Sequence, residues 1–156
     1  MRNPLPAFLA VALAATLAAC SSAPATDKDA AAVIAALAAE DLPIKLTVTY
    51  TEQTDPNRLL GRPNGYTSKA AFVDGRVDAS KMAGKEGDVG LGGGVEVFED
   101  ADAAQARADY IQNIGKAGPM FAEYSYTAGN VLVRVSKELP PTDAKAYEAA
   151  LNKIVQ

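Results

Sequence analysis

The strongest constraint on the fold is a pair of alternating runs, residues 121–127 and 131–137, separated by Ala128-Gly129-Asn130. Apolar side chains at every second position are typical of half-buried β-strands. Glycine and asparagine tolerate the positive φ angles that a tight hairpin turn requires. The two runs therefore predict an antiparallel β-hairpin, and the chain must build part of its core on a sheet.

Three further strands and three helices are indicated by periodicity. Residues 45–50 alternate cleanly, residues 70–77 are a weaker strand candidate, and residues 95–98 are a third. The glycine-rich stretch 87–94 is expected to be irregular, because glycine loses the most backbone entropy on ordering. Apolar residues at helical spacing predict helices over residues 30–41, after Asp100 or Asp102, and after Pro140-Pro141.

This order of elements indicates an α+β fold for a single domain over residues 30–156. About five mainly antiparallel strands are expected to form one sheet, with the helices packed on one face. The alternation in residues 45–50 fits a sheet that has one wetter side.

The N-terminus has the pattern of an export signal. Arg2 precedes an apolar run over residues 5–17, which is short for a permanent membrane span. Leu17-Ala18-Ala19-Cys20 then matches the lipobox of bacterial lipoproteins, in which the cysteine accepts the lipid. We expect a signal peptide over residues 1–19, a lipid on Cys20 and a flexible tether over residues 20–29. A non-lipidated secretory signal is the alternative, but it would leave an exported protein with one unpaired thiol.

The charge balance limits the class of partner. Without Arg2, the chain carries 14 basic and 19 acidic side chains, a net charge of −5. Nucleic acids and anionic lipid surfaces bind clustered lysine and arginine, so this balance argues against both. Membrane attachment is therefore expected to come from the lipid anchor, on the extracytoplasmic face of the cell membrane.

The residue types that are absent exclude several chemistries. The sequence has no histidine, and its one cysteine lies in the lipobox. Ser-His-Asp and Cys-His catalysis are therefore excluded, as are zinc, haem and copper sites with the usual nitrogen or sulfur ligands. The glycines at 90–94 precede a predicted strand and not a helix, so they do not form a phosphate-binding loop. We expect no cofactor and no metal.

Three other patterns are better explained by structure than by chemistry. Ser68 and Lys69 are adjacent, so in a strand they point to opposite faces and cannot act as a serine–lysine pair. The acidic residues between 96 and 102 lack the spacing of a calcium loop, and helix capping accounts for Asp100 and Asp102. Tyr124 and Tyr126 share a strand face, where packing is the simpler interpretation.

The connection over residues 51–69 is the candidate ligand or partner loop. It is longer than most structureless connections and combines turn residues with arginines in an acidic protein. Leu59 and Leu60 could hold it against the domain. The alternative is an ordered loop whose arginines pair with the protein's own carboxylates. The candidate site residues are Asp55, Asn57, Arg58, Arg62, Tyr66 and Lys69.

With its lipobox and the segments 54–57, 60–63, 93–98 and 131–140, the chain resembles small lipoproteins of high-GC Gram-positive bacteria such as the actinomycetes. The resemblance implies location and anchoring alone. We expect a non-enzymatic domain that binds an envelope protein or a small ligand. The alternatives are a cell-envelope hydrolase that uses carboxylates, and a transporter's solute-capture lipoprotein, for which the chain is short.

Overall fold

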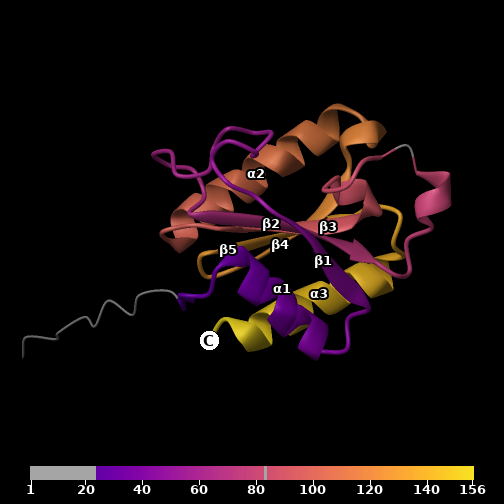
Figure 1. Ribbon diagram of the computed structural model, residues 1–156, viewed down its shortest axis with the longest axis horizontal. Coiled ribbons are helices and arrows are strands. Elements are labelled where there is room, and N and C mark those ends of the chain that lie inside the picture. Colours follow the sequence, from indigo (N-terminus) through magenta and orange to yellow (C-terminus); the bar gives the residue numbers. More distant parts are fainter. Residues whose placement is uncertain (1–23, 83) are drawn as a thin grey trace, which may run out of the picture.

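The computed structural model describes residues 24–82 and 84–156. The expected signal peptide and the expected lipidation of Cys20 lie outside the described residues. Figure 1 shows the arrangement of the elements. The main helices and strands are α1 (Ala30–Ala39), β1 (Ile44–Thr49), β2 (Ser68–Asp74), β3 (Gly92–Val97), α2 (Ala101–Ala117), β4 (Glu123–Ala128), β5 (Val131–Ser136) and α3 (Pro141–Ile154). Short 3-10 turns are η1 (Ala79–Lys81), η2 (Val89–Leu91) and η3 (Pro119–Phe121).

The five strands form one sheet in the order β1-β2-β3-β5-β4, and every neighbouring pair is antiparallel. The expected α+β fold with five antiparallel strands is thus confirmed. The expected hairpin is β4–β5, and its turn contains Gly129 at φ +51°. Because β5 also pairs with β3, this hairpin forms one side of the sheet, with β4 as the edge strand.

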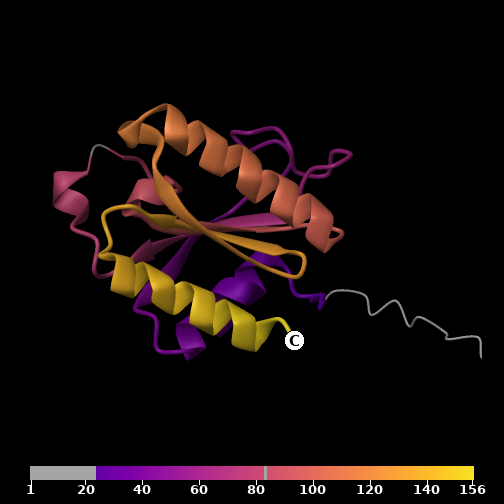
Figure 2. The same cartoon turned by 180° about the vertical axis from the view of Figure 1, so that it is seen from behind.

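The helices lie on both faces of the sheet, so the expectation that they cover one face was wrong. Helices α1 and α3 lie on one face and α2 lies on the other (Figures 1 and 2). Strand β5 shows the reason, because both of its faces are buried. Val131, Val133 and Val135 pack in the core beneath α1 and α3, whereas Leu132 packs on the α2 side.

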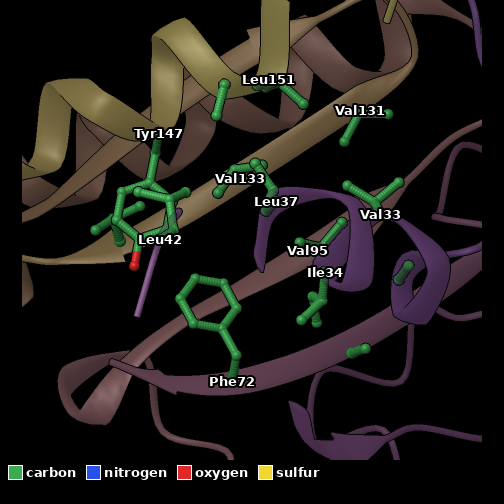
Figure 3. Close-up of a cluster of buried hydrophobic side chains, with 14 of the residues drawn as sticks. Val33, Ile34, Leu37, Leu42, Phe72, Val95, Val131, Val133, Tyr147 and Leu151 are labelled. Carbon is green, nitrogen blue, oxygen red and sulfur yellow. The ribbon is translucent and has the colours of Figure 1, made fainter. Parts of the chain in front are cut away.

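Figure 3 shows the larger core, in which side chains of α1 and α3 meet those of the central strands. Tyr147 of α3 stacks on Phe72 of β2, with ring centroids 5.6 Å apart. Its hydroxyl donates to the buried carboxylate of Asp74, which also accepts two hydrogen bonds from the Arg76 side chain. Burial and the Asp74 contact raise the pKa of Tyr147. These contacts fix α3 to the sheet.

Aspartates cap the first two long helices, and of the two candidates expected for α2 it is Asp100 that caps. The Asp29 carboxylate accepts from the Ala32 amide at 2.7 Å, and the Asp100 carboxylate accepts from the Ala103 amide at 2.8 Å. Each satisfies an amide that has no partner inside its own helix.

The segment before α1 is held against the domain, which corrects the expectation of a flexible tether for residues 24–29. The backbone amide and carbonyl of Thr26 bond to the side chain of Asn130 at 2.9 and 3.0 Å. The Asn130 amide also donates to the carbonyl of Phe98. Asn130 therefore ties the start of the described chain to the β4–β5 turn.

Glycines 92–94 lie inside the central strand β3, although the sequence suggested irregular structure there. Close packing explains the difference. A Cβ atom on Gly93 would lie 2.3 Å from both the Phe72 ring and the carbonyl oxygen of Arg134. The absence of a side chain lets Phe72 and β5 approach the strand, which offsets the entropic cost of ordering glycine.

The two neighbouring glycines give a matched test. Gly93→Ala should lower the free energy of unfolding by about 1–3 kcal/mol, the usual cost of overpacking a core. Gly94→Ala should change it by less than about 1 kcal/mol, because its Cβ would contact only the Ala70 carbonyl, at 3.3 Å. Urea denaturation measures both. Equal effects would contradict the packing explanation.

Candidate functional site

An elongated groove of about 1380 Å³ lies between α2 and the sheet face beneath it. Helix α2 packs over β4 and β5 through Ala104, Ala108 and Ile111. The connection 50–67 covers the other side of this face, where Leu60 and Tyr66 join the same apolar cluster. The two coverings meet at Asn57 and in this shared cluster, and the groove is the part of the sheet face that they leave open.

Helix α2 presents a second stripe of residues to this groove. Ala103, Arg107, Tyr110 and Ile114 recur every three or four residues, so they share one side of the helix. This stripe lies beside the buried stripe that packs on the sheet. Ala103, at one end of the stripe, is small and leaves the groove open there. Tyr110 and Ile114, toward the other end, are large and exposed.

Asp55 is the centre of a buried network beside the groove. Its carboxylate accepts from Lys69 Nζ at 2.8 Å and from the Tyr66 hydroxyl at 2.6 Å. It also accepts from the backbone amides of Leu59 and Leu60. One carboxylate therefore holds the connection in its turn conformation and fastens it to β2.

The surroundings of Asp55 change the pKa of two groups. Burial alone would raise the pKa of Asp55, but the hydrogen bonds from Lys69 and Tyr66 outweigh it and hold that pKa far below its usual range. Burial and the bond to Asp55 raise the pKa of Tyr66. Asp55 is thus ionised and Tyr66 neutral at physiological pH.

Glu96 of β3 organises a second network on the floor of the groove. Its two oxygens accept from Arg107 Nε of α2 at 3.0 Å and from Arg134 Nη1 of β5 at 3.3 Å. Arg134 also donates two bonds to Glu123, at 2.6 and 2.7 Å. Burial alone would lower the pKa of Arg134, but its pairing with Glu123 raises it. These pairs connect α2 with three strands.

Asn57 joins the two networks. With its amide oxygen facing inward, it accepts from Lys69 Nζ at 3.0 Å and from Arg107 Nη2 at 3.2 Å. This orientation follows from the surrounding donors. We call the joined set the floor network: Asp55, Asn57, Tyr66, Lys69, Glu96, Arg107, Glu123 and Arg134. Its three cations balance its three anions.

In the structure, the six site residues expected from the sequence fall into two groups. It brings Asp55, Asn57, Tyr66 and Lys69 together, and Lys69 lies in β2 and not in the loop. Arg58 and Arg62 lie apart, exposed on the outer side of the loop, where they line a small hollow of about 410 Å³. Neither forms an ion pair with another described residue, so the alternative in which these arginines pair with the protein's own carboxylates was wrong.

Sequence reasoning missed Glu96, Arg107 and Arg134. A signal existed, because Glu96 and Arg134 are single charges inside strands that are otherwise apolar or small. A charge at a buried strand position needs a partner, which is evidence for an interaction across the sheet.

The other sequence patterns have structural roles. The Ser68 hydroxyl accepts from the Ala30 amide, so it anchors α1 while Lys69 points to the other face. Tyr124 and Tyr126 pack against the larger core. Residues 96–102 do not converge on a point, and the described residues contain no cluster of acidic or sulfur ligands suited to a metal ion.

Comparisons with protein-family models, curated proteins and solved structures gave no match. The interpretation of the site therefore rests on its geometry. Within residues 24–82 and 84–156, no helix has the length and apolar character needed to cross a bilayer.

Removing the Asp55 charge should test the first network. Asp55→Asn leaves Lys69 with no buried counter-charge and should cost about 3–5 kcal/mol of stability. Adding Lys69→Met should recover part of this loss. Because the folded pKa of Asp55 is depressed, its contribution is present above pH ~4 and is lost as pH falls through the folded pKa. The variant should therefore lose less stability than the wild type between pH ~5 and ~2.

Denaturant unfolding across this pH range measures the effect. The exposed Glu86→Gln is the control and should change stability by at most about 0.5 kcal/mol. Additive losses in Asp55→Asn and Lys69→Met would contradict a coupled pair.

Proposed function

We propose that this protein is a lipid-anchored, extracytoplasmic binding domain of the cell envelope, and that it binds its ligand or partner in the groove beneath α2. The lipobox at residues 17–20 supports the anchor. The groove supports binding, because it is concave, mainly apolar and crossed by a few fixed polar groups.

The position of the exposed apolar side chains carries this proposal. Five large hydrophobic residues of the described chain are exposed, and four of them line the groove: Tyr110, Ile114, Met120 and Phe121. Met120 and Phe121 are 76% and 52% exposed. Scattered exposed apolar residues are ordinary, but their concentration at one concave surface is typical of an interaction site.

A carboxylate hydrolase is less well supported by this geometry. Glu96 accepts from two arginines, Glu123 accepts two bonds from Arg134, and Asp55 accepts from Lys69 and Tyr66. Each is engaged with a cation, so none is free to serve as a proton donor for a leaving group. Release of sugar from purified peptidoglycan by the wild-type protein would favour the hydrolase.

The anchor is tested by replacing Cys20. Cys20→Ser removes the thiol that accepts the lipid, so the protein should leave the membrane fraction or accumulate as an uncleaved precursor. Metabolic labelling with an alkyne fatty acid, followed by fractionation, measures both. A Ser21→Ala variant should behave as the wild type. Lipid labelling that persists in Cys20→Ser would overturn the assignment.

The groove is tested by cross-linking in cells of the native host. Tyr110→Ser together with Phe121→Ser should abolish the cross-linked partner bands while lowering the unfolding midpoint only slightly, because about half of each residue is exposed. Leu46→Ser alters the one large exposed hydrophobic residue of the described chain that lies outside the groove lining, on the edge strand β1, and should retain the bands.

The same experiment includes the outer loop surface as a second candidate. Arg58→Ala with Arg62→Ala should retain every band if the groove is the site. Loss of the bands in this variant, with retention in the groove variant, would place binding on the loop, as the sequence suggested.

A further inference from the structure

The length of the groove indicates an extended occupant. The groove follows α2 from Asp102 to Ile114 and continues to Phe121 in η3. Helix α2 has 17 residues and is therefore about 25 Å long. An extended chain rises about 3.3 Å per residue, so seven or eight residues span that length. The volume of about 1380 Å³ also exceeds the range of roughly 300–1,000 Å³ for most small-molecule sites.

The charge around the groove indicates the sign of the charge that an occupant should carry. The floor network is balanced, but the remaining charged lining residues are not. These rim residues are Asp88, Asp100, Asp102, Glu138 and Lys137. The rim thus has a net charge of −3, with acids at both ends of α2. Complementarity favours a positively charged partner and disfavours a second copy of this acidic chain.

The groove also supplies contacts for an apolar and a polar part of such a partner. Tyr110, Ile114, Met120 and Phe121 offer apolar surface at the far end. Arg107 uses Nε for Glu96 and Nη2 for Asn57, while its Nη1 has no hydrogen-bond partner among the described residues. This group can donate to a peptide carbonyl.

We infer that the groove binds an extended, apolar peptide segment of seven or eight residues that carries lysine or arginine at its ends. This inference rests on the groove being the binding site. The segment lies along α2, with its apolar side chains on Tyr110, Ile114 and Phe121. Its basic residues meet Asp100 and Asp102 at one end and Asp88 and Glu138 at the other.

A membrane surface fits this groove less well. The apolar end at η3 lies on the opposite side of the molecule from Pro24, where the described chain begins (Figures 1 and 2). A domain anchored through residues preceding Pro24 would hold that end away from its own membrane. The acidic rim would also repel anionic lipid.

Peptide selection tests the inference. The mature lipoprotein in nanodiscs is panned against a random 12-residue phage library, with empty nanodiscs for counter-selection. Enriched peptides should combine apolar residues with lysine or arginine. One is then synthesised with a fluorophore, and its Kd is measured by anisotropy.

Matched variants separate the groove from general attraction to an acidic protein. A groove variant removes three rim charges through Asp88→Asn, Asp102→Asn and Glu138→Gln. The Kd of the peptide should rise by roughly tenfold or more, if each exposed ion pair contributes up to ~1 kcal/mol. Asp41→Asn, Glu52→Gln and Glu148→Gln together remove the same charge outside the groove lining and should leave Kd unchanged. Raising the salt concentration should weaken peptide binding by the wild type more than peptide binding by the groove variant.

The outcomes distinguish this inference from the proposed function. Enrichment of acidic peptides, no enrichment, or equal weakening by both sets of variants would overturn the peptide inference. If cross-linking in cells still depends on Tyr110 and Phe121, the groove remains the binding site for another occupant. If neither assay depends on the groove, both proposals fail.

Discussion

A chain of paired charges beneath α2 determines the arrangement on that side of the molecule. Asp55 and Lys69 fasten the connection 50–67 to β2, and Glu96 holds Arg107 and Arg134. Removing these charges from water is costly, so each is stable only with its partner in place. Asn57 links the two groups, so the loop, the helix and the sheet are fixed relative to one another. The groove is the space that this fixed arrangement leaves open.

The sequence predicted the strands, the helices and the hairpin because their periodicity is local. It did not predict that α2 crosses to the other face, because that depends on Leu132 being buried on the side opposite Val131 and Val133. The length of the connection and its mixture of turn residues and basic side chains placed Asp55, Tyr66 and Lys69 in the candidate loop, but they could not show that these residues face inward and bond to one another. The same features drew attention to Arg58 and Arg62, which the loop turns outward. Arg107 was missed because a charge on a helix is ordinary until its partner, Glu96, is known.

The structure relates the position of the groove to the end of the domain at which the proposed anchor would attach. Asn130 ties Thr26 to the β4–β5 turn, so the domain cannot reorient freely about residues 24–29. The turn η3, whose residues line the apolar end of the groove, lies on the opposite side of the molecule from the start of the described chain (Figures 1 and 2). In a protein anchored through the residues that precede Pro24, this end of the groove would face away from the point of attachment. In the proposed peptide complex, the acidic rim and the exposed aromatic residues would determine which segments bind.

Exchange of the arginine side-chain protons tests most directly whether the floor network holds this face together. Nitrogen-15 NMR of the wild-type domain resolves the Nε–H group of each arginine. The structure predicts slow exchange with water for Arg107 and Arg134, whose Nε–H groups bond to Glu96 and Glu123. It predicts fast exchange for the exposed Arg58 and Arg62, which serve as internal references. Equally fast exchange at all four positions would contradict the account, because the pairs beneath α2 would then not be formed in solution.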